Sequence, residues 1–452
     1  MNFAASLLSL FQSGLSGLAA YLAAHVLLCL LPAFFIAGAL SALLPKEAIT
    51  RYLGRDASKW ISYPASALGG FFLAVCSCTI MPLFASIYKK GAGLGPAITF
   101  LFVGPAVNIL AISFTGVQIG MDIALARIIL SMVFGILIGL LMAWFFRKDD
   151  TQHAKTTANN QLFAGKASIP TRTIVFFLLL LGTLIAGTLQ IGLLRDVFFE
   201  IRVPGIWAVS LQAWLDKIIP PDAALGIEGV SVHGLFLIGL LILIAITSLK
   251  GFRRIYEGLT PWIIVTLSLI TLTLVIASFS VVASTEGLII GMNGRLVAEI
   301  LLLGAIWWMG ARVFSTNERQ EWLWETWRFV KQIIPLLLVG VFVASIARSL
   351  IPASWIMTVA GRNTLWANLA GVLFGVFMYF PTLVEVPVAQ TFLSLGMHRG
   401  PLLAYLLADP ELSLQSILIT NTVIGKKKTA VYVVLVTIFS TLSGLIFGWF
   451  IK

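Results

Sequence analysis

The residues most able to do chemistry are two cysteines set two positions apart, Cys76 and Cys78, in the run 74–82. Residues two apart on a regular helix point in nearly opposite directions, so these thiols converge only on extended or unwound backbone. Pro82 and the pair Gly69–Gly70 favour such a break. Convergent thiolates bind soft species such as Zn(II), Cu(I) or trivalent arsenic. The alternative is that both cysteines are small buried hydrophobic residues, and the pattern leaves both interpretations open.

A polar residue interrupts the next apolar segment, where Asn108 follows Gly104-Pro105. An asparagine within a membrane span either bonds to a neighbouring helix or binds substrate. Its position just after a backbone break favours neither interpretation over the other, and we treat Asn108 as a candidate substrate ligand beside the two cysteines.

Three carboxylates occur in apolar surroundings near the C-terminal end: Glu385, Asp409 and Glu411. Carboxylates inside a bilayer are costly unless they are paired, hydrated or protonated, so they are candidates for proton coupling. Glu411 follows Pro410 directly and would fall in a first helical turn. A simple helix cap is therefore an alternative role for Glu411.

The composition places all these residues in a membrane protein. The 452 residues are 59% hydrophobic and 11% charged, and the mean hydropathy is +1.00, whereas soluble domains carry about 25% charged residues. The net charge of +11 lies in short loops, where basic residues fix membrane orientation, and requires no nucleic-acid partner. Because the sequence has no Walker loop, Rossmann glycine pattern or His-rich box, we expect neither an enzyme nor a bound cofactor or metal.

Apolar runs of spanning length recur along the whole chain. We expect ten spans, at 18–44, 93–115, 122–146, 173–194, 231–248, 261–281, 297–311, 332–350, 400–423 and 429–450. Two further apolar stretches, 61–88 and 365–396, are broken by glycine and proline. The segment 195–230 is typical of a small interfacial domain, and 315–331 of an amphipathic helix on the membrane surface.

An internal repeat connects the two ends of the chain. Glycines and prolines of the first part recur 305 residues later: Gly70 with Gly375, Pro82 with Pro387, Gly91 with Gly396, Gly95–Pro96 with Gly400–Pro401, and Pro105 with Pro410. Together with Gly104 and Pro381, Gly70, Pro82, Pro105, Pro387 and Pro410 are our candidate helix breaks. The chain then divides into repeat one at 1–146, a central insert of about four spans at 147–331, and repeat two at 332–452.

Charge predicts that the two repeats are inverted. The loop after the first span holds Lys46, Arg51, Arg55 and Lys59, whereas its counterpart at 352–364 holds only Arg362. The loop 116–121 has no basic residue, whereas its counterpart holds three lysines at 426–428. Basic loops mark the cytoplasmic side. The sequence therefore predicts an all-α integral membrane protein of two inverted repeats, with ten spans, re-entrant hairpins at 61–88 and 365–396, and both termini outside.

Five motifs stand out along the chain: Cys-Ser-Cys-Thr-Ile-Met-Pro-Leu (76–83), Gly-x-Gly-x-Gly-Pro-Ala (91–97), Gly-Pro-Ala-Val-Asn (104–108), Tyr-Phe-Pro-Thr-Leu-Val-Glu-Val-Pro (379–387) and Leu-Leu-Ala-Asp-Pro-Glu-Leu-Ser-Leu (406–414). Together they resemble the ArsP-like permease family. The resemblance covers about 18–146 and 332–450 and leaves the central insert outside. It implies an efflux permease, since characterised members export trivalent organoarsenicals and many others have no assigned substrate.

We therefore expect a multi-pass permease of a prokaryotic inner membrane that exports a small thiophilic solute. Cys76, Cys78 and Asn108 would bind it, and Glu385, Asp409 and Glu411 would couple its movement to protons. One alternative is a carrier of a sulfur-containing anion or metabolite, with free backbone amides at the helix breaks binding the anion. Another is a membrane thiol redox component that uses Cys76 and Cys78 as a pair. We expect the solute and the bilayer as partners. The sequence leaves open whether the protein forms a homodimer.

Overall fold

The computed structural model describes residues 3–24, 28, 30–43, 46–73, 77–107, 112, 115–116, 118–152, 170–188, 192–204, 206–219, 229–252, 255, 260–284, 287–350, 358–377 and 382–450. Within these residues the chain is almost entirely helical. Six helices are long and apolar enough to cross a membrane: α8 (Met121–Phe145), α10 (Thr171–Thr188), α13 (Val232–Gly251), α15 (Gly294–Arg312), α16 (Thr316–Leu350) and α22 (Lys426–Phe450). Helices α20 (Arg399–Leu412) and α21 (Leu414–Ile424) meet at 46° and would make a seventh span together.

The remaining helices are shorter or less apolar. They are α1 (Phe3–Ala24), α2 (Leu31–Leu43), α3 (Lys46–Leu53), α4 (Lys59–Leu73), α5 (Ser77–Lys89), α6 (Leu94–Ala106), α11 (Gly192–Arg195), α12 (Ile206–Ile218), α14 (Pro261–Ala277), α18 (Leu365–Phe377) and α19 (Thr382–Ser394). The described helices thus support a multi-pass protein, and the count of ten spans stays a prediction. The first predicted span, 18–44, falls on two helices, α1 and α2.

The element boundaries recur at the offset found in the sequence. Helix α5 begins and ends 305 residues before α19, and α8 does so before α22. Helix α6 begins 305 residues before α20 and ends one residue earlier in its repeat. Glycines with positive φ recur with them, Gly91 (99°) with Gly396 (95°) and Gly120 (149°) with Gly425 (87°), a backbone region that favours glycine. The same local structures are therefore built twice.

Close helix contacts also recur. A Cβ on Gly70 of α4 would lie 2.9 Å from the Gly104 nitrogen of α6, and a Cβ on Gly375 of α18 would lie 3.0 Å from the Asp409 nitrogen of α20. Glycine at both positions lets the backbones approach as small residues do in other membrane helix pairs. The helix that carries Asp409 is therefore held tightly against its neighbour.

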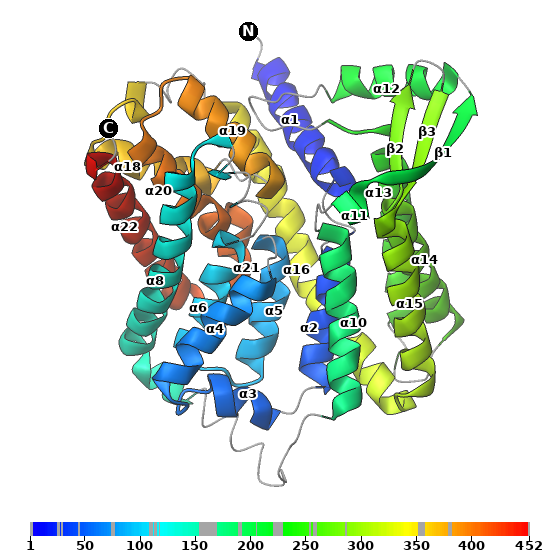
Figure 1. Cartoon of the computed structure of the whole chain (residues 1–452), viewed down its shortest axis with the longest axis horizontal. Coiled ribbons are helices and arrows are strands. Elements are labelled where there is room, and N and C mark those ends of the chain that lie inside the picture. The colour runs from blue at the N-terminus through cyan, green and yellow to red at the C-terminus, as the bar shows by residue number, and fades with distance from the viewer. Residues whose placement is uncertain are drawn as a thin grey trace.

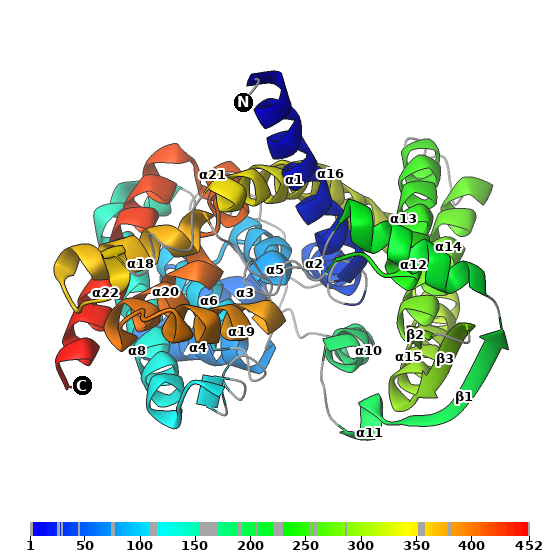
Figure 2. The same ribbon diagram turned by 90° about the horizontal axis from the view of Figure 1, so that it is seen from above.

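Three groups of helices are visible in space. Helices α4–α8 and α18–α22 pack together on one side of the molecule, and α10–α15 lie on the other (Figure 1, Figure 2). Helix α2 packs on α5, α10 and α16, so it connects the two sides. The main core includes Phe34 of α2, Phe84 of α5, Leu101 of α6 and Leu337 of α16, all at most 1% exposed. The repeat helices therefore share one apolar core.

Two features of the insert differ from the prediction. A three-stranded antiparallel sheet of order β1-β3-β2 lies at one end of it, from β1 (Val197–Pro204), β2 (Ser280–Ser284) and β3 (Gly287–Asn293). The sequence predicted no strand, because short apolar runs beside membrane spans look like span ends. The predicted surface helix at 315–331 and span at 332–350 are one continuous helix, α16, which contains Pro335. A proline in a membrane helix can be tolerated when neighbouring groups satisfy the backbone.

Candidate functional site

A fully buried ion pair joins the two repeats. Arg127 of α8 is 0% exposed and Glu385 of α19 is 1% exposed. The arginine Nη2 lies 3.0 Å from Oε1 and donates a hydrogen bond to Oε2 at 3.1 Å. Its Nε donates to the carbonyl oxygen of Ala106, the last residue of α6, at 3.0 Å. Buried charges persist only when they are paired and hydrogen-bonded, so α6, α8 and α19 hold one another through this contact.

A second buried polar contact lies in repeat two. The Tyr432 hydroxyl of α22 donates to Oε2 of Glu411 in α20 at 3.0 Å, and both residues are 1% exposed. Oε1 of Glu411 has no hydrogen-bond partner in the described part of the chain. Glu411 lies in the last turn of α20 and not in the first turn of a helix. The sequence-based alternative of an N-terminal cap for Glu411 is therefore wrong, because α20 continues through Pro410.

The two contacts occupy equivalent positions of the two repeats. Arg127 and Tyr432 are 305 residues apart, and so are Ala106 and Glu411. In repeat one the arginine donates to the backbone of Ala106, and in repeat two the tyrosine donates to the side chain of Glu411. We call Arg127, Glu385, Glu411 and Tyr432 the inter-repeat cluster. The position that holds the cation Arg127 in repeat one therefore holds Tyr432 in repeat two, and each donates to the residue at the position of Ala106 or Glu411.

The asymmetry extends to Glu385 and Asp409. The equivalent of Glu385 is Ile80, whose Cδ1 would lie 2.7 Å from a Cβ on Gly104. Gly104 is itself the equivalent of Asp409, which is buried at 1% exposure in α20. An isoleucine packs against a glycine in repeat one where repeat two has two carboxylates. Glu385 and Asp409 of repeat two therefore have uncharged counterparts in repeat one. Repeat one contributes the arginine of the ion pair, Arg127.

The structure places only part of the predicted substrate site. Cys76 and Asn108 lie outside the described residues, and so does Pro381. The backbone of Cys78 is the second residue of α5, and its side chain is not described. Three residues further along α5, Met81 Sδ accepts a hydrogen bond from Thr420 Oγ1 of α21 at 3.7 Å. The start of α5 therefore packs against repeat two.

The other candidate break residues lie inside helices. Gly70 lies in α4, Pro82 in α5, and Gly104 and Pro105 in α6. In repeat two, Pro387 lies in α19 and Pro410 in α20. The bend between α20 and α21 follows at Ser413, three residues after Pro410. Gly70, Gly104, Pro105 and Pro410 therefore lie in the last turn of a short helix, whereas the predicted breaks at Pro82 and Pro387 are wrong, because α5 and α19 continue through them.

Two charged residues buried within predicted spans were missing from our sequence prediction. Arg127 lies in the predicted span 122–146, and Glu299 lies in the predicted span 297–311. An ionisable residue inside a span is a functional candidate, so this signal was available for both. Glu299 is 0% exposed in α15, and neither side-chain oxygen has a hydrogen-bond partner within the described residues. Only Arg127 belongs to the inter-repeat cluster.

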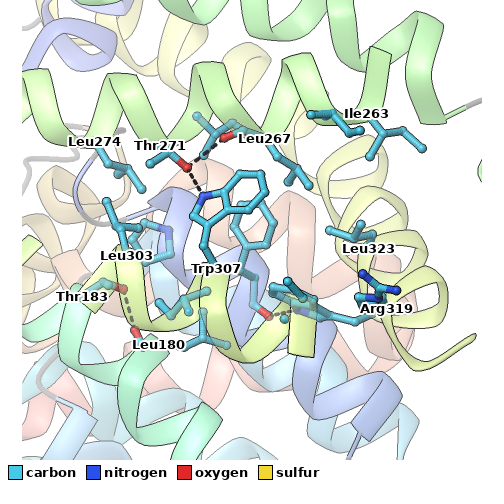
Figure 3. A pocket seen from close by; sticks show the side chains of 18 residues that line it. Leu180, Thr183, Ile263, Leu267, Thr271, Leu274, Leu303, Trp307, Arg319 and Leu323 are labelled. Atoms are coloured by element: carbon cyan, nitrogen blue, oxygen red, sulfur yellow. Dashed lines mark hydrogen bonds between the residues drawn. The ribbon is translucent and has the colours of Figure 1, made fainter. Parts of the chain in front are cut away.

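A cavity of about 150 Å³ lies away from this cluster, between the insert and α2 (Figure 3). Apolar side chains line most of it, and the Trp307 indole donates from Nε1 to Thr271 Oγ1 at 2.8 Å. Arg319 stands at the end opposite Leu303 and Leu274. Such a cavity suits an apolar group and offers no acid–base or thiol chemistry. Among the described residues no three His, Cys, Asp or Glu side chains gather as a metal site.

Comparisons with known proteins identify relatives over nearly the whole chain. A family model described as a predicted permease, ArsP_1, matches residues 13–449. The UPF0718 protein of Methanocaldococcus jannaschii is 33% identical over 428 residues, covering 95% of this chain and 93% of that protein. No solved structure matches. The match includes the central insert, which the sequence motifs had left outside.

Proposed function

Because this chain belongs to the ArsP_1 family of predicted permeases, we propose that it exports a small thiophilic solute, a trivalent organoarsenical or a similar species, across a prokaryotic inner membrane in exchange for protons. The observation that carries the proposal is the buried ion pair between Arg127 and Glu385. It connects the two repeats at a place where a transporter of this build would bind its substrate.

The inter-repeat cluster supports proton coupling. If one repeat moves against the other, the Arg127–Glu385 pair has to separate inside the protein. Protonation of Glu385 would remove the attraction and leave a neutral acid, which is far cheaper to bury than an isolated carboxylate. Glu411 and Tyr432 supply a second carboxyl and a hydroxyl in the same cluster. A proton arriving at these groups would therefore release the contact that holds the repeats together.

Two further ion pairs support the predicted orientation of the repeats. Lys428, near the start of α22, lies 3.7 Å from Asp149, beyond the end of α8. Arg55 lies 3.8 Å from the neighbouring Asp150. The basic residues at 426–428 and the loop with Arg55 are therefore on one side of the protein, and α8 and α22 run in opposite directions in Figure 1. This supports inverted repeats with both basic segments in the cytoplasm.

Cysteine labelling tests the orientation. In a variant without the three native cysteines, we expect Ala57→Cys and Lys427→Cys to resist an impermeant maleimide in intact cells and to react after permeabilisation. Arg362→Cys should react in intact cells, because the loop 352–364 is predicted outside. Labelling of Ala57→Cys from outside would contradict the inverted arrangement.

A second prediction concerns the role of the two thiols in transport. Cys76→Ser and Cys78→Ser should each lower transport of a trivalent organoarsenical at least tenfold without lowering the amount of protein in the membrane. A hydroxyl is close in size to a thiol but is a poor ligand for soft elements. Cys29→Ser is the matched control, since Cys29 lies in a plain apolar segment and its replacement should leave transport unchanged. Wild-type flux in the double variant Cys76→Ser/Cys78→Ser would make both cysteines structural.

One observation favours a second substrate class. The Nη1 group of Arg127 is buried and has no hydrogen-bond partner among the described residues. A free guanidinium N–H suits an anion, so a sulfur-containing anion or metabolite is the alternative cargo. Parallel flux measurements with arsenicals and with thio-anions distinguish these two substrate classes. A thiol redox component, the remaining alternative, would act without net movement of any solute.

A further inference from the structure

A polar recess of about 340 Å³ lies at the end of α8, away from the inter-repeat cluster. Its lining comes from the loop between α3 and α4, the first turns of α4, Pro96 of α6 and the segment 140–150. The volume is within the range of about 300–1,000 Å³ that small-molecule pockets occupy. The proposed function gives this recess no role.

The recess is lined by more basic than acidic side chains. Arg55, Lys59 and Arg147 face Asp56 and Asp150. Asp150 is already engaged, since its Oδ1 accepts a hydrogen bond from the Leu94 backbone at 2.9 Å and its Oδ2 lies 3.8 Å from Arg55. Lys59 and Arg147 have no ion-pair partner in the part of the chain that the structure describes. Two cations therefore remain available to an anionic ligand.

Tryptophans place this recess at a membrane surface. Trp144 lines it and is 70% exposed, and Trp60, next to Lys59, is 91% exposed. Ile61 and Leu68 continue the exposed surface of α4 and are 56% and 49% exposed. Exposed tryptophans between a basic loop and an apolar helix face are typical of the headgroup level of a bilayer. A ligand that enters this recess from the membrane would therefore be a lipid.

The matching place in repeat two holds different side chains. Thr364 stands there where α4 has Lys59, and a Cβ on Gly448, the counterpart of the lining residue Ala143, would lie 2.5 Å from the Asn363 side chain. The Asn363 amide donates to the carbonyl of Leu445 at 2.9 Å, and Leu445 is the counterpart of Leu140 in the recess. Asn363 and Thr364 therefore lie in repeat two where repeat one has the recess and Lys59.

From the cavity, the free cations and the tryptophans together, we infer that this recess binds the phosphate of an anionic phospholipid headgroup. The phosphate oxygens would accept hydrogen bonds from Lys59 and Arg147, and the acyl chains would lie along the exposed face of α4. Basic pockets at the cytoplasmic side of membrane proteins recognise lipid phosphates in this way. A bound headgroup would tie α4 to α8 at the base of the first hairpin.

The test is lipid binding to the full-length protein in phosphatidylcholine nanodiscs that contain a small fraction of phosphatidylglycerol. Native mass spectrometry should show one tightly retained phosphatidylglycerol in the wild type. We expect Lys59→Gln and Arg147→Gln each to weaken its retention about fivefold, and the double variant about 30-fold. The matched control is Arg51→Gln/Lys148→Gln, which removes two exposed cations on the same side that do not line the recess.

Three outcomes would overturn the inference: full retention in the double variant, an equal loss in the control double variant, or displacement of the lipid by millimolar inorganic phosphate. The last would mean that the recess takes a soluble phosphate. If the double variant unfolds, lipid retention in the two single variants tests the inference. Each of the two side chains is exposed, so the protein should fold without it.

Discussion

Replacing Arg127 with methionine should lower the free energy of unfolding by about 3–5 kcal/mol, because Glu385 would be left as an uncompensated buried charge. Transport should be lost with it, since α6, α8 and α19 would lose their common contact. The amount of folded protein after a temperature series, followed by size-exclusion chromatography of the detergent-solubilised protein, measures the stability. Flux in proteoliposomes measures the transport.

The double variant Arg127→Met/Glu385→Gln separates structure from function. Removing both charges should recover most of the stability, because a neutral pair costs little to bury, and transport should stay absent. Arg399→Gln is the matched control. Arg399 pairs with Asp122 at 2.9 Å across the same two repeats, but the side chains are 31% and 34% exposed, so the loss should stay within about 1 kcal/mol. Normal flux in the double variant would remove the ion pair from the mechanism.

Neutralising the repeat-two carboxylates should abolish accumulation driven by a pH gradient. We expect this of Glu385→Gln, Asp409→Asn and Glu411→Gln, because a permanently neutral side chain cannot load and release a proton. Substrate binding should change less than threefold, since the predicted thiol ligands are untouched. Equilibrium binding of the solute and gradient-driven flux, measured on the same preparations, give the two values.

Glu299→Gln is the control for this prediction. Glu299 is also a fully buried carboxylate in a membrane helix, but it belongs to α15 of the insert. Its replacement should leave proton-driven flux unchanged if the inter-repeat cluster does the coupling. A loss of coupling in Glu299→Gln with normal coupling in the three repeat-two variants would move the proton path into the insert.

Much of the fold could be predicted from the sequence because backbone constraints are local. The glycines and prolines at the 305-residue offset predicted a duplicated structure, and α5 and α19 begin and end at that same offset. Apolar length predicted membrane helices, and the motifs around Cys76 and Glu385 predicted the family whose model matches residues 13–449. These features depend on neighbouring residues in the chain, which a single sequence displays.

The contacts between repeats could not be predicted in the same way. Glu385 was recognised as a buried acid, but its partner is 258 residues away, and nothing near Arg127 in the sequence indicates this pairing. The Tyr432–Glu411 contact becomes apparent only when α20 and α22 are packed together. The sheet was missed because β2 and β3 are short apolar runs beside helices. Their strand pairing depends on the distant β1.

The most direct test of the account is flux of a trivalent organoarsenical through the purified wild-type protein in proteoliposomes with an imposed pH gradient. Exchange of the solute for protons predicts that it accumulates on the acidic side several-fold beyond protein-free liposomes, and that a protonophore abolishes this accumulation. Flux that matches protein-free liposomes, or that is the same with and without the gradient, would contradict a proton-coupled permease for thiophilic solutes.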